Sequence, residues 1–264
     1  MSQTAGANLG SPSLNEDVRR FWEAEPCGTG APELGGFEKG SLAWFLELER
    51  TRYLLDPYIW SVAQFSRHAG ERVLEIGVGA GTDHAQWAAV TDDLHGVDLT
   101  SAAIETTARN LSLRGRHSDL QRVDAEILPF ETGSFDVVYS WGVIHHAEAP
   151  DRVLAEVHRV LRPRGVFLGM LYARHSLVAY RKWVGNALKA GRPWRSLSSV
   201  IWDHMESVGT KAYTETEVRA LFADFENCRT TRFLTPYDTE RLPTWADRVL
   251  PPALGWNIAI EAKR

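Results

Sequence analysis

The stretch Val73-Leu74-Glu75-Ile76-Gly77-Val78-Gly79-Ala80-Gly81-Thr82 decides the fold, because a short apolar run leads into three alternating glycines. Val73, Leu74 and Ile76 form the buried run that a central parallel strand needs. Glycine reaches positive φ and lets a ligand lie against the main chain. Thr82 suits a helix N-terminus. The stretch therefore predicts a strand, a turn and a helix start whose free N–H groups favour a carboxylate or a phosphate.

The spacing of the glycines separates this loop from a dinucleotide fingerprint, which has glycine at its first, third and sixth positions. Here the sixth position is Thr82, and the extra glycine is Gly81. A nicotinamide-dependent oxidoreductase is therefore the weaker alternative. The observed pattern is Glu-x-Gly-x-Gly-x-Gly, led by Glu75. Because a glycine loop alone is a weak signal, the other strand ends must identify the ligand.

Composition limits the class of protein. The chain has 264 residues, 44% of them hydrophobic, which suits one α/β domain with a helical cap. A formal net charge of −5 gives no overall attraction for nucleic acid. Cys27 and Cys228 lie far apart and lack metal-site spacing. We therefore expect a cytoplasmic protein that binds neither a metal nor nucleic acid.

The sequence gives no indication of export or of stable membrane insertion. Residues 1–15 are small and polar, without the charged and apolar regions of a signal peptide. No apolar stretch approaches the roughly 18 residues of a membrane-spanning helix. The basic residues are mostly arginine, which we interpret as a hint of a GC-rich bacterial genome.

A helical region precedes the first strand. We expect a disordered tail over 1–15, and then helices that start near Asn15, at Ser41 and around Pro57. Together these predict a helical N-terminal cap over residues 16–70. Two interpretations stay open, because the cap can pack against the sheet edge or cover the substrate.

Strands and helices then alternate, which is typical of a parallel sheet. Strands are expected at 73–76, 94–97, 120–123, 135–140, 166–171, 228–234 and 256–262, with helices at 83–89, 101–113, 150–161 and 215–223. Residues 173–212 break this alternation, and they mix aromatic with cationic side chains. We therefore predict one domain over 71–264, with the insertion 173–212 as a cap or lid.

Acidic side chains follow the second and third predicted strands. Asp98 lies about 20 residues after the first glycine, where an acid accepts hydrogen bonds from ribose hydroxyls. A role for Asp98 as a helix cap is the weaker alternative, because Thr100 can cap that helix. Asp124, followed by Ala125 and Glu126, can accept from an adenine amine, although a solvated turn is the alternative. Because carboxyl ends of parallel strands meet at one edge, these groups should face one crevice.

Two adjacent histidines, His145 and His146, follow the fourth strand. Histidine titrates near neutrality, so either residue is a candidate general base. The alternative is a structural histidine that holds the loop before Pro150. One of two adjacent side chains usually faces a pocket while the other packs.

Three residues just past the fifth strand are weaker candidates for substrate contact, namely Tyr172, Arg174 and His175. Arg174 can pair with an acidic substrate. Its alternative role is that of a solvated cation at a helix start.

These motifs resemble those of class I S-adenosylmethionine-dependent methyltransferases. The resemblance extends from about residue 71 to residue 171. Glu75 to Gly81 is similar to the first motif, Asp98 to the ribose acid, and Asp124-Ala125 to the adenine clamp. The segment 124–130, with the histidine pair, resembles the small-molecule branch that includes ubiquinone/menaquinone C-methyltransferases (methyltransferase type 11-like).

The resemblance implies a Rossmann-like α/β fold with seven mostly parallel strands, an antiparallel last strand and helices on both faces. It implies S-adenosyl-L-methionine as cofactor and no metal. The implied cofactor contacts are Glu75, Gly77, Gly79, Gly81, Thr82, Asp98, Leu99, Asp124, Ala125, Glu126, Ser140 and Trp141. His145 and His146 are the candidates for catalysis.

We expect methyl transfer to a small apolar or amphiphilic metabolite, by in-line displacement, as in secondary metabolite biosynthesis. Carbon, oxygen and nitrogen acceptors all stay open, as do a monomer and a homodimer. Amine-directed nucleic-acid methyltransferases have an Asn/Asp-Pro-Pro-aromatic turn after strand four, whereas this chain has Ser140-Trp141-Gly142-Val143. The alternatives are an NAD(P)-dependent oxidoreductase and a non-catalytic cofactor-binding protein.

Overall fold

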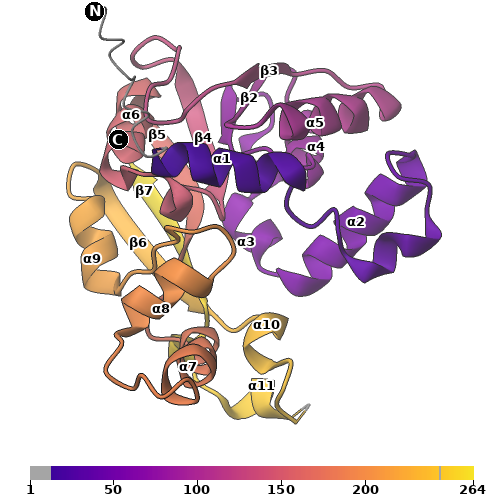
Figure 1. Cartoon of the computed structure of the whole chain (residues 1–264). Helices are drawn as coiled ribbons and strands as arrows, with labels where there is room; N and C mark the ends of the chain where they lie inside the picture. Colours follow the sequence, from indigo (N-terminus) through magenta and orange to yellow (C-terminus); the bar gives the residue numbers. More distant parts are fainter. Residues whose placement is uncertain (1–12, 244) are drawn as a thin grey trace, which may run out of the picture.

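The computed structural model describes residues 13–243 and 245–264, which contain one seven-stranded sheet with the order β3-β2-β1-β4-β5-β7-β6 (Figure 1). The strands are β1 (Val73–Ile76), β2 (Leu94–Asp98), β3 (Asp119–Arg122), β4 (Phe135–Trp141), β5 (Leu161–Tyr172), β6 (Glu226–Phe233) and β7 (Asn257–Lys263). Only β7 runs antiparallel to its neighbours, β5 and β6. The predicted fold class is therefore confirmed.

Helices cover both faces of the sheet. They are α1 (Leu14–Ala24), α2 (Leu42–Leu55), α3 (Ile59–Ala63), α4 (Thr82–Ala88), α5 (Ser101–Leu113), α6 (Pro150–Val160), α7 (Leu177–Trp183), α8 (Leu197–His204), α9 (Glu215–Leu221), α10 (Pro236–Thr239) and α11 (Ala246–Val249). Short 3₁₀ turns occur at Pro32–Gly36, Phe65–His68, Ile144–His146 and Pro252–Leu254, and a π turn at Val184–Leu188. None of these helices is long and apolar enough to cross a membrane.

Alternate residues of the central strands enter two separate cores, as a sheet buried on both faces requires. Val73 and Tyr139 pack with α3, α4 and α7, whereas Leu74 and Val138 pack with α6 and α9. All four side chains are fully buried. Because β1, β2, β4 and β5 pair in parallel, their carboxyl ends meet on the same side of the sheet.

Several predicted boundaries were wrong. The predicted disordered tail lies outside the described residues for 1–12, but Leu14 and Asn15 belong to α1, and Ser13 caps that helix with a hydroxyl that accepts from the Glu16 amide. Gln64, with φ of 50°, divides the expected third helix into α3 and a 3₁₀ turn. β5 begins at Leu161 rather than 166, because Leu161 already pairs with Phe135 and Arg164 adopts φ of 71°.

A buried ion pair joins the N-terminal helices to the sheet. The Asp83 carboxylate, 2% exposed, accepts from Arg52 Nε at 2.8 Å, from the Tyr53 hydroxyl at 3.1 Å and from the Tyr139 hydroxyl at 2.8 Å. These partners come from α2 and β4, while Asp83 lies in α4. The sequence suggested Asp83 as a helix start, but it binds these partners, and Gly81 precedes α4 without a side-chain cap.

We predict that Asp83→Ala lowers the free energy of unfolding by about 3–5 kcal/mol, because it leaves the Arg52 charge buried without its partner. Asp17→Ala is the control, since Asp17 forms an exposed ion pair with Arg20 and such pairs contribute about 1 kcal/mol or less. Urea unfolding measures both losses. Equal losses in the two variants would contradict the role assigned to the buried pair.

Candidate active site

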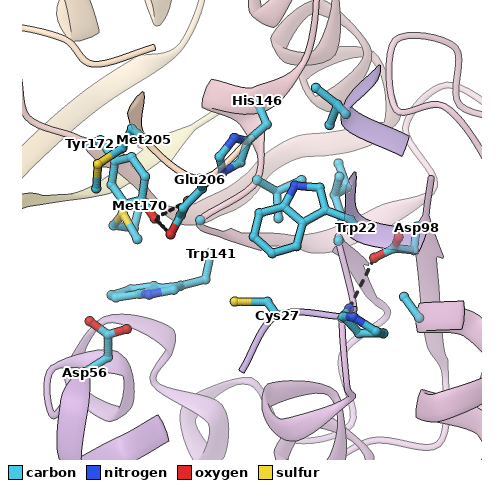
Figure 2. Close-up of a pocket in the computed structure, with 18 of the residues that line it drawn as sticks. Trp22, Cys27, Asp56, Asp98, Trp141, His146, Met170, Tyr172, Met205 and Glu206 are labelled. Atoms are coloured by element: carbon cyan, nitrogen blue, oxygen red, sulfur yellow. Dashed lines mark hydrogen bonds and ion pairs between the residues drawn. The ribbon is translucent and has the colours of Figure 1, made fainter. Parts of the chain in front are cut away.

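A cavity of about 660 Å³ lies at the carboxyl ends of β1, β2, β4 and β5. Its walls include the glycine loop from Gly77 to Ala80, Asp98, Trp141 and Tyr172. Figure 2 shows side chains that line it. The crevice predicted from the strand ends is therefore present, and it extends beyond the predicted cofactor residues toward the insertion.

The three glycines of the loop have different tasks, although all adopt positive φ. A Cβ on Gly77 would lie 2.2 Å from Val143 Cγ2, and a Cβ on Gly81 would lie 2.9 Å from Thr107. A Cβ on Gly79 would meet no atom within 4 Å. Gly77 and Gly79 line the cavity, whereas Gly81 does not. The lack of a side chain at Gly77 and Gly81 therefore allows neighbouring residues to pack closely, whereas the lack of one at Gly79 leaves room for a ligand.

Asp98 is fixed beside this loop. Its Oδ2 accepts from the Gly79 amide at 3.2 Å, and its Oδ1 accepts from the Thr100 amide at 2.9 Å and hydroxyl at 2.8 Å. Burial raises the pKa of the Asp98 carboxyl. Asp98, Leu99 and Thr100 all line the cavity. A carboxylate held at this point fits a ribose diol.

Glu75 shares a proton with His84, which sequence reasoning missed. His84 Nδ1 lies 2.9 Å from Glu75 Oε2, and its Nε2 lies 2.8 Å from the Ser118 hydroxyl. That hydroxyl donates to the Leu94 carbonyl, so His84 Nε2 donates to it and Nδ1 accepts from a protonated Glu75. Burial raises the pKa of Glu75 well above its usual range and lowers that of His84 to about 3. Glu75 lines the cavity, so a positively charged ligand group beside it would favour the ionised form of its carboxyl group.

Arg52 is a second residue that sequence reasoning missed. It lines the same cavity as Thr82, and its guanidinium keeps its pair with the buried Asp83. Nothing in the local sequence separates Arg52 from other helix-surface arginines. It supplies a cation beside the glycine loop, where the carboxylate of a methionine group fits.

The third strand end is covered by α1. The Asn15 side-chain amide donates to Asp124 Oδ2 and to Glu126 Oε1, both at 2.9 Å. The Glu23 carboxylate, at the other end of α1, accepts from the amides of Ser101 and Ala102. Figure 1 shows α1 crossing in front of the strands. α1 therefore forms one wall of the crevice, to which Asn15, Val18 and Trp22 contribute.

Besides Gly81, two predicted cofactor contacts lie outside the cavity. Glu126 faces α1 and accepts from the Ala149 amide at 2.9 Å, while Asp124 and Ala125 line the cavity. Ser140 is buried in β4, and its hydroxyl donates to the Ile76 carbonyl at 3.1 Å. Its neighbour Trp141 does line the cavity. Ser140 therefore joins two strands, because strand alternation turns it away from the ligand.

Of the two adjacent histidines, His146 faces the cavity and His145 packs behind it, as we expected for one of the pair. His146 lines the cavity, and its Nε2 lies 3.2 Å from Glu206 Oε2. The Tyr172 hydroxyl donates to the same carboxylate at 3.1 Å (Figure 2). On the opposite side of the ring, Nδ1 lies 3.0 Å from the Ser207 hydroxyl and 3.1 Å from that of Thr210. The ring is therefore held at Nδ1, whereas Nε2 faces the Glu206 carboxylate at ion-pair distance without a hydrogen bond.

His145 is buried behind this group and does not line the cavity. Its ring centroid lies 3.8 Å from that of Tyr172, and neither ring nitrogen has a hydrogen-bond partner among the described residues. Burial lowers the pKa of His145 well below its usual range. The structure therefore places it in a packing position rather than in contact with substrate.

Arg174 and His175 also lie outside the cavity. Arg174 pairs with Glu217 at 2.8 Å and donates to the Ala212 carbonyl at 3.0 Å. His175 is exposed beside the Tyr180 hydroxyl. The chain turns away from the strand end here, so of the three candidates only Tyr172, the last residue of β5, reaches the cavity.

His145, His146 and Glu206 bring ligand atoms within 4.8 Å of one another, the kind of group that can hold a metal. Zinc takes such atoms at about 2.0–2.2 Å from the ion, so several of them must move before they share one. The stack of His145 against Tyr172 opposes that movement. The absence of a metal stays a prediction.

The remaining wall of the cavity combines apolar and aromatic side chains with charged ones, among them Arg181, Lys182 and Arg241. It comes from α1, β4, β5, the insertion and the C-terminal region, and includes Val18, Trp22, Trp141, Met170, Val178, Met205, Tyr237 and Trp256. Trp22 packs edge-on against His146 with ring centroids 5.5 Å apart. Such walls bind apolar ligands and orient them with a few polar groups.

Known proteins are similar to this chain in sequence and in fold. The family model described as a methyltransferase domain matches residues 74–169. A phthiotriol/phenolphthiotriol dimycocerosates methyltransferase from Mycobacterium ulcerans is 35% identical over 208 residues, which cover 73% of this chain and 72% of the relative.

Two solved structures show the fold over nearly the whole chain. Geranyl diphosphate C-methyltransferase from Streptomyces coelicolor A3(2) has a TM-score of 0.61 and 15% identity, covering 97% of this chain and 98% of that chain. The [4+2]-cyclase SpnF has a TM-score of 0.60 and 17% identity, covering 96% and 97%. At such low identities the similarity shows a shared fold and says nothing about which reaction is catalysed.

We predict that Gly79→Ala weakens the binding of S-adenosylmethionine about five- to a hundredfold, because a methyl group enters a filled site at a cost of about 1–3 kcal/mol. Gly115→Ala is the matched control, since Gly115 also has positive φ and open space around its Cβ position but lies outside the cavity. Calorimetric titration measures both affinities. Equal affinities would show that nothing lies against Gly79.

We predict that His145→Phe makes the protein less sensitive to acid. Between pH 7 and pH 5 this histidine takes up a proton in the unfolded chain but stays neutral in the native protein, because burial lowers its pKa. The free energy of unfolding therefore falls as the pH falls. Removing this group lessens the fall by up to about 2 kcal/mol at pH 5. Urea unfolding at the two pH values measures it, with the exposed His117→Gln as control. An unchanged pH dependence would contradict the burial of a neutral ring.

Proposed function

Because the chain belongs to the class I S-adenosylmethionine-dependent methyltransferases, we propose that it methylates a hydroxyl group of an apolar or amphiphilic small molecule. The observation that supports this most is the His146–Glu206 pair in an aromatic cavity that continues from the glycine loop. The pair suits an acceptor that must lose a proton, and the walls suit an apolar body.

The residues around the glycine loop fit the cofactor. Asp98 would hold the ribose hydroxyls, Asp124 and Ala125 the adenine, and Arg52 with Glu75 the methionine carboxylate and ammonium. When bound, S-adenosylmethionine supplies a methyl group on a sulfonium that is electrophilic without further activation. The protein therefore has two tasks, which are to align the acceptor and to remove its proton.

Glu206 places a carboxylate beside His146. Its backbone has φ of 45°, a left-handed conformation that is uncommon for residues other than glycine, and such strain clusters at functional sites. The carboxylate faces the His146 ring and also accepts from Tyr172. His146 Nε2, which forms no hydrogen bond among the described residues, would take the acceptor proton, and the Glu206 carboxylate 3.2 Å away would stabilise the imidazolium that forms.

The class of acceptor follows from the walls of the cavity. Tryptophan and methionine side chains enclose it on the side away from the glycine loop, and α1 and the insertion cover it. The Mycobacterium ulcerans relative acts, by its name, on phthiotriol dimycocerosates, which are lipid-like. We extend only the lipid-like character to this chain. The free thiols Cys27 and Cys228 agree with the cytoplasmic setting that we propose.

We predict that His146→Gln lowers kcat by about a hundredfold or more, because a positioned base contributes about 10²–10⁴-fold. Glu206→Gln lowers kcat less, since the ring keeps its place but loses the negative charge beside it. Both variants keep their affinity for S-adenosylmethionine in calorimetry. His175→Gln is the matched control, because His175 lies outside the cavity. Unchanged kcat in both cavity variants would contradict the role of His146 as a general base.

The acceptor itself can be found with isotopically labelled S-adenosylmethionine. The pure protein is incubated with fractionated bacterial lipid and metabolite extracts, and the label is followed by mass spectrometry. We expect label on the oxygen of an apolar product. Label only in water-soluble acids or amines would contradict the proposed acceptor class, while leaving the methyl transfer intact.

A further inference from the structure

The inserted segment carries a charge that the rest of the chain lacks. Residues 177–204 contain five basic side chains and one acidic side chain, a net charge of +4, whereas the whole chain has −5. Three of the five already have partners, because Arg181 pairs with Glu240, Arg195 pairs with Asp203, and Lys182 donates to a carbonyl. Lys189 and Arg192 pair with no acid among the described residues.

These two cations lie in a loop, residues 188–194, that is exposed along its whole length. We call it the basic aromatic loop. Its sequence is Leu-Lys-Ala-Gly-Arg-Pro-Trp. Trp194 is 78% exposed and Leu188 is 48% exposed. Large apolar side chains presented in this way, between cations and without a neighbouring acid, mark a surface that meets a partner.

The loop is held in place at both ends. The Trp183 indole N–H donates to the Arg195 carbonyl at 2.7 Å, and the Asn186 side chain donates to the Lys182 carbonyl at 3.0 Å. Arg195 also donates to the Ser199 carbonyl of α8 at 2.9 Å. The exposure of Trp194 is therefore a property of a fixed loop rather than of a fraying end.

The loop continues an apolar stripe at the edge of the active-site cavity. Tyr180, Val184 and Leu188 are exposed at intervals of four residues along α7 and the π turn, so they share one face. Lys182, Gly185 and Asn186 of the same stretch line the cavity. The cavity therefore borders on α7, next to the exposed stripe.

A second exposed group lies at the same end of the molecule, where Figure 1 shows α7, α8, α10 and α11. Trp245 and Val249, at the start and end of α11, are 60% and 67% exposed. Tyr237 and Arg241, from α10 and just after it, line the cavity. Exposed apolar side chains thus flank the cavity from two segments that lie far apart in the sequence.

We propose that the basic aromatic loop docks on a bilayer surface that contains anionic lipid, and that the acceptor passes from there into the cavity beside α7. Tryptophan settles at the boundary between headgroups and acyl chains, and lysine and arginine meet anionic headgroups. The charge of the segment is complementary to such a surface, although the chain as a whole is acidic. The passage of the acceptor rests on the proposed function, whereas the docking does not.

The test is co-sedimentation of the full chain with vesicles of phosphatidylcholine, with and without about one third phosphatidylglycerol. We expect binding to the anionic vesicles that falls with added salt. Lys189→Gln with Arg192→Gln should weaken it about 25-fold, because each cation near such a surface contributes about fivefold. Trp194→Ser should weaken it at both low and high salt.

Matched controls separate docking from general charge. Arg116→Gln with Arg229→Gln makes the same change in net charge at exposed positions outside the insertion, and Leu113→Ser removes an exposed apolar side chain from α5. Both controls should bind vesicles as the unaltered protein does.

The proposal is overturned if the loop variants bind like the controls, or if the unaltered protein does not bind anionic vesicles. It is equally overturned if sedimentation velocity shows a dimer that Trp194→Ser abolishes, since the loop then meets a second copy. Methyl transfer to an acceptor dissolved in detergent is measured separately, so a failure of docking leaves the proposed function standing.

Discussion

The close approach of the glycine turn after β1 to the loop after β4 is the constraint on which the rest of the site depends. Gly77 leaves no room for even a methyl group against Val143. This contact brings the end of β1 next to the segment that carries Trp141 and His146, while the Gly79 amide binds the Asp98 carboxylate at the end of β2. The cofactor side and the acceptor side of the cavity are therefore built by one packing contact between neighbouring strands.

The second contribution comes from segments outside the sheet. α1 covers the strand ends through Asn15 and Glu23, and α2 is held by the buried pair between Arg52 and Asp83. The insertion supplies Glu206 and the wall beyond it. These parts add walls to the crevice at the strand ends, and the resulting cavity suits the apolar or amphiphilic acceptor that we propose.

The sequence predicted what is local and periodic, and it failed where residues meet through tertiary contact. The positions of the strands, the glycine loop and Asp98 follow from spacing along successive strand–turn–helix units, so they could be predicted, whereas the antiparallel last strand was an expectation from the family resemblance. Ser140 was misjudged because its orientation depends on strand register, and Glu126 because α1 takes up its carboxylate. Glu206 and Arg52 carry no motif of their own. Only the fold brings Glu206 to His146, across 60 positions of the chain.

A structure with bound S-adenosylhomocysteine tests the central claim most directly. We predict that the ribose hydroxyls contact the Asp98 carboxylate and that the sulfur faces the part of the cavity that holds His146 and Glu206. A ribose that does not touch Asp98, or a sulfur separated from His146 by protein, would contradict it.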